Sequence, residues 1–156
     1  MILQVIMGTL GSMAVSLLFN IKKKQVLMVG GGAALTWIVY LISQNWLGMT
    51  IFEGSLLSAI AVAAYSEIMA IVAKAPATIF LTTSALPLIP GRGLYYTMYS
   101  IVNADWIKFE EFGQMTLDTA LGIACGFVVV AIVVRYIRRV KIYRKKRKLL
   151  EQVKGE

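Results

Sequence analysis

An apolar stretch that is interrupted near its centre constrains the fold of this chain most. Residues 77–102 are apolar and long enough to cross a bilayer, but Pro87, Pro90, Gly91 and Gly93 lie together near the middle. Proline removes a backbone donor and clashes with the preceding turn, so a continuous helix is not expected here. In hydrocarbon every freed backbone group needs a partner, so such a break persists only inside protein or beside a water-filled cavity. The sequence therefore predicts a transmembrane helix that is broken near the midplane.

The rest of the composition also indicates a multi-pass membrane protein. Hydrophobic residues make up 58% of the 156 positions, and the mean hydropathy is +0.74. Several apolar runs exceed the roughly 18 residues that mark a spanning helix. The chain has no histidine and a single cysteine, Cys125, in an apolar run. Within one chain this excludes disulfides, zinc sites and histidine-based catalysis, and no cofactor is expected.

We expect an all-α membrane protein with five transmembrane helices. The first segment, residues 1–20, lacks the basic start of a secretory signal, because no lysine or arginine precedes Lys22. The stretch from Asn103 to Gly113 is polar and is expected to be a loop. The five segments are residues 1–20, 26–43, 50–73, the broken segment 77–102, and 114–134.

The basic residues predict the orientation. Lys22–Lys24, Lys74 and the tail fall on one side of a five-span topology, which must be the cytoplasm by the positive-inside rule. The N-terminus and the loops at 44–49 and 104–113 would then lie outside. A re-entrant fourth segment would place the tail opposite Lys22–Lys24, so the charges favour a fourth segment that crosses.

The net charge of +8 belongs mainly to the tail and does not indicate a nucleic-acid partner. Ten of the sixteen lysines and arginines lie at or after Arg135. We divide the chain into a transmembrane domain, residues 1–138, and a basic cytoplasmic tail, residues 139–156. The basic run at 135–148 is typical of a stop-transfer signal. Contact with anionic lipid headgroups would add roughly 1 kcal/mol per basic residue near the surface.

Glu67 is a charge within the third apolar segment. It shares one helical face with the small residues Ala59, Ala63 and Ala70 and with Lys74. A rise of ~1.5 Å per residue places it on the order of 10 Å from the cytoplasmic end. A carboxylate there must be paired, hydrated or protonated. It either carries protons or contacts substrate, or it forms a structural ion pair with Arg92 or with another subunit.

The break itself is the predicted substrate site. After Pro90, a restarted helix would expose the N–H groups of Gly91, Arg92 and Gly93 at its positive dipole end. With the Arg92 guanidinium, these groups could cradle a carboxylate. The alternative is that Arg92 only neutralises Glu67 or faces water. Tyr95 and Tyr99 follow on the same helical face and could line the path.

These stretches together resemble the threonine/serine exporter family, specifically the short subunit equivalent to the C-terminal half of the full-length exporter. Arg92 departs from the small residue typical of that place. The matching residues are Phe19-Asn20, Tyr65-Ser66-Glu67, and the stretch from Lys74 through Pro90-Gly91 to Tyr99.

The resemblance implies export of small hydrophilic acids across the cytoplasmic membrane: threonine or serine, and succinate in two-subunit versions. It also implies secondary transport driven by proton movement, a longer membrane subunit as partner, and a chain of inverted topology relative to the other half. A structural or assembly subunit without a site is the alternative. A membrane-embedded enzyme has little support, because the sequence has no histidine, no clustered carboxylate pair and no serine beside a base.

Overall fold

The described part of the chain is entirely helical. The computed structural model describes the backbone of residues 2–154 and the side chains within that range except those of residues 141 and 144–154. No strand occurs within residues 2–154, as the all-α prediction required. In chain order the elements are α1 (Ile2–Leu18), α2 (Lys23–Asn45), α3 (Ile51–Ala73), α4 (Ala77–Ser84), the short 3-10 helix η1 (Leu86–Leu88), α5 (Gly91–Val102) and α6 (Trp106–Lys154).

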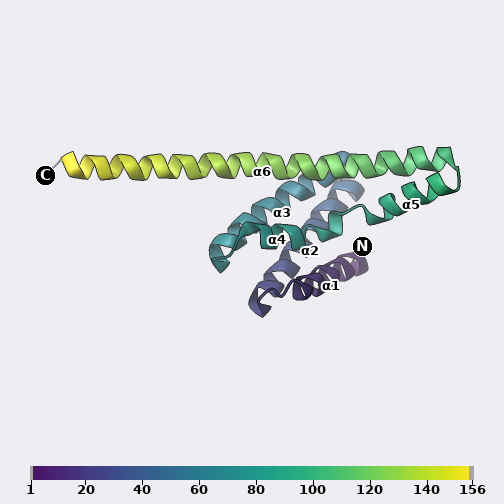
Figure 1. Cartoon of the computed structure of the whole chain (residues 1–156), viewed down its shortest axis with the longest axis horizontal. Coiled ribbons are helices and arrows are strands. Elements are labelled where there is room, and N and C mark those ends of the chain that lie inside the picture. Colours follow the sequence, from purple (N-terminus) through teal and green to yellow (C-terminus); the bar gives the residue numbers. More distant parts are fainter. Residues whose placement is uncertain (1, 155–156) are drawn as a thin grey trace.

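The core forms around α3, which packs against both α2 and α6 (Figure 1). On the outer side of α2 lies α1, while α5 runs back along the first part of α6. The broken segment, α4 with η1, contacts α2, α3 and α1. The break is therefore surrounded by protein on several sides, as freed backbone groups in a membrane require.

Small residues allow α3 and α6 to pack closely. A Cβ atom on Gly122 would lie 2.6 Å from the carbonyl oxygen of Phe52, and one on Gly126 would lie 2.6 Å from the Cβ of Ala59. Both positions of α6 therefore require glycine at this crossing. In a bilayer such close backbone approach, rather than water exclusion, drives helix association.

The third predicted segment has the expected boundaries because its ends carry local signals. Thr50 and Glu53 form a reciprocal capping box: the Glu53 N–H donates to the Thr50 hydroxyl at 3.3 Å, and the Thr50 N–H donates to the Glu53 carboxylate at 2.9 Å. At the other end Lys74 takes a left-handed conformation, with φ of 50°. These caps satisfy backbone groups that a helix terminus leaves free.

The structure confirms the predicted break. The Thr36 hydroxyl of α2 shares its proton between the Gly32 carbonyl oxygen of its own helix at 2.7 Å and the Ser84 carbonyl oxygen at 3.2 Å, and the Ser84 hydroxyl donates to the Val29 carbonyl oxygen at 3.2 Å. The two bonds that involve Ser84 fix the end of α4 to α2. The chain then makes one 3-10 turn, and α5 begins at Gly91, directly after Pro90.

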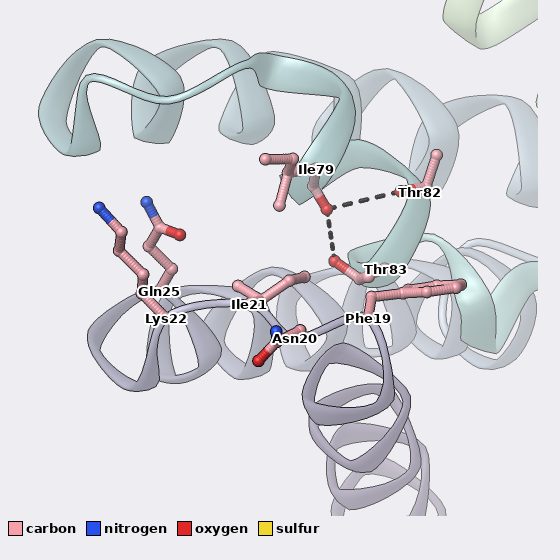
Figure 2. Close-up of a pocket in the computed structure, with 8 residues that line it drawn as sticks. All are labelled: Phe19, Asn20, Ile21, Lys22, Gln25, Ile79, Thr82 and Thr83. Carbon is pink, nitrogen blue, oxygen red and sulfur yellow. Dashed lines mark hydrogen bonds between the residues drawn. The ribbon is translucent and has the colours of Figure 1, made fainter.

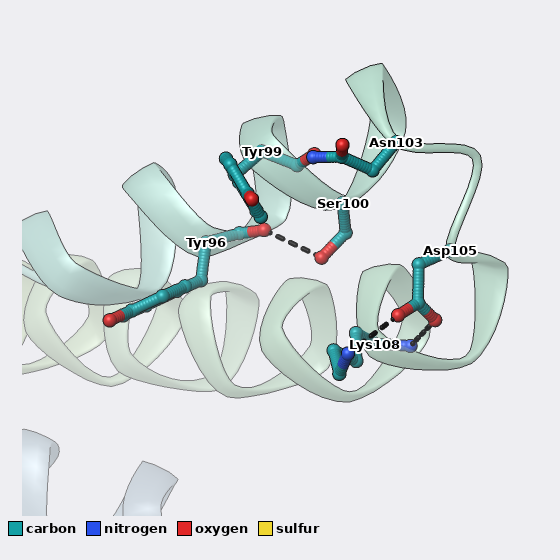
Figure 3. A network of polar contacts seen from close by, with 6 residues as sticks. All are labelled: Tyr96, Tyr99, Ser100, Asn103, Asp105 and Lys108. Carbon is teal, nitrogen blue, oxygen red and sulfur yellow. Dashed lines mark hydrogen bonds and ion pairs between the residues drawn. The ribbon is translucent and has the colours of Figure 1, made fainter.

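The predicted polar loop over residues 103–113 is wrong, because α6 already begins at Trp106. Asp105 caps this start: its carboxylate accepts the Lys108 N–H at 3.2 Å and pairs with the Lys108 ammonium at 2.7 Å (Figure 3). Its side-chain contact with Lys108 also holds the pKa of the Asp105 carboxyl below its usual value. Instead of the predicted residues 114–134, α6 spans 49 residues.

Within residues 2–154, three helices are long and apolar enough to cross a membrane: Lys23–Asn45, Ile51–Ala73 and Trp106–Val140. The helix α1 and the segment Ala77–Leu88 are apolar but shorter. The five-span topology with an outside N-terminus therefore stays a prediction. The predicted boundary between the membrane domain and the tail falls inside α6, which continues through residues 138 and 139 without interruption.

Candidate functional site: a cavity at the helix break

The break borders an open cavity of about 190 Å³ that is also lined by two other helices. Trp37 and Tyr40 of α2 line one side, and Met115 and Thr119 of α6 line another. The remainder of the wall is the segment from Pro87 to Gly93. Four of the predicted substrate-binding residues are thus brought together here: Pro90, Gly91, Arg92 and Gly93.

Two backbone N–H groups at the start of α5 have no acceptor within the part of the chain that the structure describes. The Gly91 N–H, which was expected to be free, donates to the Ile89 carbonyl oxygen at 2.7 Å. The Leu94 N–H donates to the Pro90 carbonyl oxygen at 2.9 Å, and no side chain caps the helix. The N–H groups of Arg92 and Gly93 therefore remain without an acceptor among the described residues. They can serve an anion at the positive end of the α5 dipole.

The Arg92 side chain lies at the rim of this cavity. Its guanidinium carbon is 5.6 Å from the centre of the Tyr96 ring, which in turn stacks on Phe112 of α6 with 5.0 Å between ring centres. Such a cation–π contact orients the guanidinium while leaving its N–H donors available. Figure 3 shows the Tyr96 ring extending along α6.

Trp37 belongs to this site and was not singled out from the sequence. Its indole nitrogen Nε1 is buried, yet it has no hydrogen-bond partner in the described part of the chain. The ring stacks on Tyr40 with 5.4 Å between ring centres. Buried polar groups are normally paired, so an unpaired donor on a side chain that lines the cavity is a candidate ligand contact. The available signal was a tryptophan deep within a predicted span rather than at its interfacial end.

Tyr95 and Tyr99 do not line the cavity. They stack on each other with 6.2 Å between ring centres and are 63% and 55% exposed in the isolated chain. Gly93, by contrast, is buried against Thr116 of α6, where a Cβ atom would clash with the threonine hydroxyl. The two tyrosines therefore remain only a predicted part of the substrate path.

Glu67 does not reach the break either. Its carboxylate accepts a hydrogen bond and ion pair from Arg138 of α6 at 2.7 Å. The suggested Glu67–Arg92 pair is wrong, because α3 packs on α6 while α5, which carries Arg92, packs on an earlier part of α6. Arg138 lies in the basic run 135–148 that the sequence predicted to be a stop-transfer signal.

The described residues contain no group of three or more histidine, cysteine, aspartate or glutamate side chains placed to hold a metal ion. Their arrangement is that of a multi-pass membrane protein in which a broken helix borders a small cavity. The profile of the family described as "Threonine/Serine exporter, ThrE" matches residues 4–133, so the chain belongs to this family of transporters and lies in the cell membrane. No curated protein and no solved structure is significantly similar to it.

Proposed function

We propose that the chain is the short subunit of a secondary exporter, equivalent to the C-terminal half of a full-length transporter, and that it works with a longer membrane subunit. Its substrates would be small hydrophilic acids, either threonine- and serine-like amino acids or a dicarboxylate such as succinate. The observation that carries this proposal is the set of unpaired donors at the break cavity, in a chain whose family exports threonine and serine.

In this proposal the cavity binds the substrate carboxylate. The unpaired N–H groups of Arg92 and Gly93 and the indole N–H of Trp37 supply neutral donors. The Arg92 guanidinium supplies charge and can bind a carboxylate through two parallel hydrogen bonds. Because these groups come from α2 and α5, a change in the packing of α5 would alter the site and so couple binding to movement.

We further propose that Glu67 couples export to protons. Its carboxylate is 27% exposed and its partner Arg138 is 65% exposed, so water can reach the pair. Separation of α3 from the distal part of α6 would release Glu67 to take up a proton. Closure would restore the ion pair and expel it. The pair thus links the protonation of Glu67 to the position of α6.

For the topology we retain five crossings, with the N-terminus outside and the tail in the cytoplasm. Much of the apolar surface of α1 is exposed in this chain, including Leu3, Met7 and Leu10, and would face lipid or the longer subunit. Arg135 and Arg139 are exposed and could contact anionic lipid. The side chains of 141 and 144–148, which complete the predicted lipid contact, lie outside the described residues.

A structural subunit without a site of its own is the second candidate. The Glu67–Arg138 pair favours it, since an ion pair inside one chain accounts for Glu67 without any transport role. The deciding experiment is co-purification with a longer membrane protein encoded beside this chain, followed by efflux of labelled threonine and succinate from loaded vesicles. Efflux by the complex that is lost with the Pro87→Ala/Pro90→Ala/Gly91→Ala variant supports the exporter, whereas efflux retained by that variant supports the structural subunit.

A further inference from the structure

A second cavity, of about 450 Å³, lies between the turn that joins α1 to α2 and the outer face of α4 (Figure 2). It is separate from the break cavity, with which it shares no lining residue. Its wall consists of Phe19, Asn20, Ile21, Lys22, Gln25, Ile79, Thr82 and Thr83.

The turn that forms one wall is held by its backbone. Asn20 is left-handed, with φ of 55°, and its N–H donates to the Leu17 carbonyl oxygen at 2.9 Å. The Ile21 N–H donates to the Ser16 carbonyl oxygen at 3.1 Å. Asparagine tolerates this conformation better than most residues. The turn is therefore held by backbone hydrogen bonds and not by a hydrogen bond of the Asn20 side chain.

The polar side chains of this cavity have no partners of their own. The side chains of Asn20, Lys22 and Gln25 make no hydrogen bond or ion pair with the other described residues, and those of Lys22, just before α2, and of Gln25 extend side by side toward the connection between α3 and α4 (Figure 2). The Thr82 hydroxyl donates to the Thr78 carbonyl oxygen at 2.8 Å and the Thr83 hydroxyl donates to the Ile79 carbonyl oxygen at 2.6 Å, so both hydroxyl protons are already used within α4.

The charge of the cavity has one sign. No aspartate or glutamate occurs in residues 1–52 or 68–104, so α1, α2 and α4, the elements around the cavity, contain no acid. Glu67, the nearest acid along α3, is already paired with Arg138. The Lys22 ammonium, with the Gln25 amide beside it and no acid among its neighbours, is suited to an anionic oxygen ligand (Figure 2).

We propose that this cavity is a loading site that binds the carboxylate of the exported acid before it reaches the break. The inference rests on the proposed export of small acids and on the orientation that puts Lys22–Lys24 in the cytoplasm. Lys22 provides the charge, and Asn20 and Gln25 bind the remaining polar groups. The two cavities are joined by α4 and η1: Thr82 and Thr83 contact the first, and Pro87, shortly after them, contacts the second.

The test measures occupancy directly. In full-length protein carrying Cys125→Ser, Thr82→Cys places a thiol in the cavity wall, and Thr78→Cys places one on the same helix outside it. Reaction with a small thiol reagent is followed in inside-out vesicles with and without threonine or succinate. We expect either acid to slow labelling at position 82 and not at position 78.

Lys22→Gln and Lys23→Gln form the matched pair, since both remove one charge from the same cluster but only Lys22 lines the cavity. Lys22→Gln removes one charge-assisted hydrogen bond. The acid concentration that halves the labelling rate at position 82 should therefore rise about tenfold. Lys23→Gln should leave it unchanged. Absence of protection, or equal effects of the two variants, would overturn the loading site.

An anionic lipid headgroup offers the same chemistry, so vesicles of neutral lipid are compared with vesicles containing phosphatidylglycerol. If labelling at position 82 is slowed only by the anionic lipid and does not depend on the acids, the cavity is a lipid site and the proposal is overturned. Efflux of the acids is measured in parallel, in vesicles that contain the protein without these substitutions. If the acids are exported and protection is absent, only the loading site fails. If protection occurs without export, the cavity binds the acids, but the proposed exporter function fails and the loading role fails with it.

Discussion

The carboxylate of Glu67 in α3 lies 2.7 Å from the guanidinium of Arg138 in α6, although 71 positions separate them in the chain. Glu67 lies within the last two turns of α3, so the pair closes the end of the α3–α6 contact that is distant from the capped starts of both helices. Because both side chains are partly exposed, the pair contributes little to stability, on the order of 1 kcal/mol or less. Because the pair connects two helices, we assign it a greater role in linking the protonation of Glu67 to the position of α6 than in stabilising the fold.

We expect Glu67→Gln to abolish the dependence of efflux on a pH gradient while the amount of assembled complex stays normal. Arg138→Gln should keep that dependence, because it leaves the carboxylate in place. Efflux at several imposed pH gradients, with complex quantified by co-purification, is the measurement. If the two single variants behave alike and the double variant restores normal efflux, the pair is structural and proton coupling must lie elsewhere.

Trp37→Phe should raise the KM for threonine or succinate about tenfold, because it removes one hydrogen-bond donor while keeping an aromatic ring beside Tyr40. Trp46→Phe is the control, since Trp46 is 81% exposed after the end of α2. A second measurement uses the fluorescence of a Trp46→Phe/Trp106→Phe variant, in which Trp37 is the sole tryptophan. Its fluorescence should change when substrate is added. An unchanged KM together with unchanged fluorescence would remove Trp37 from the site.

Closing the break should eliminate export without preventing assembly. In Pro87→Ala/Pro90→Ala/Gly91→Ala, helix formation through the break becomes more favourable by ~3 kcal/mol for each proline and ~1 kcal/mol for the glycine. A continuous helix would bond the free N–H groups of Arg92 and Gly93 to carbonyl oxygens. Gly93 is left unchanged because a Cβ there would clash with Thr116. Efflux and crosslinking to the longer subunit are measured on the same variant, and wild-type efflux would show that the break is only a packing kink.

The α3–α6 crossing should tolerate no side chain at Gly122. Its Cβ would lie 2.6 Å from a backbone oxygen, so Gly122→Ala should lower the free energy of unfolding by about 1–3 kcal/mol. Gly113→Ala in the same helix is the control, because its Cβ would make only an ordinary 3.8 Å contact with Thr97. Thermal melting in detergent compares the two variants, and similar melting temperatures would contradict the close crossing.

The orientation is testable with thiols in a Cys125→Ser background. We expect Gly48→Cys and Ala104→Cys, in the two connections predicted to lie outside, to react with an impermeant reagent added to intact cells. Tyr136→Cys, at an exposed position of α6 just beyond the predicted apolar segment 114–134, should react only after lysis. Labelling of position 136 in intact cells would reverse the topology.

Local chemistry explains which features could be read from the sequence. The break was predictable because Pro87 and Pro90 act on their own turns, whatever surrounds them. The start of α3 was equally local, since Thr50 and Glu53 cap each other. The start of α6 was missed although Asp105 gives an N-cap signal, because the polar residues after it resemble a loop. Their polarity instead reflects a helix that begins before the predicted apolar segment 114–134.

The contacts between helices were not predictable in the same way. The Glu67–Arg138 pair depends on α6 remaining helical past its apolar part, and on the glycines that bring it close to α3. Trp37 lies beside the break because hydrogen bonds of Thr36 and Ser84 hold α4 against α2. Each of these contacts is set by tertiary packing between residues far apart in the chain, and a single sequence does not record that packing.

The unbroken length of α6 makes it a rigid lever. At ~1.5 Å per residue its 49 residues extend ~74 Å, so a tilt of about 10° at its α5 end would displace the far end by about 13 Å. Figure 1 shows the distal part of this helix extending beyond the rest of the bundle. A small rearrangement where α5 meets α6 would therefore be magnified into a displacement large enough for a neighbouring subunit to detect.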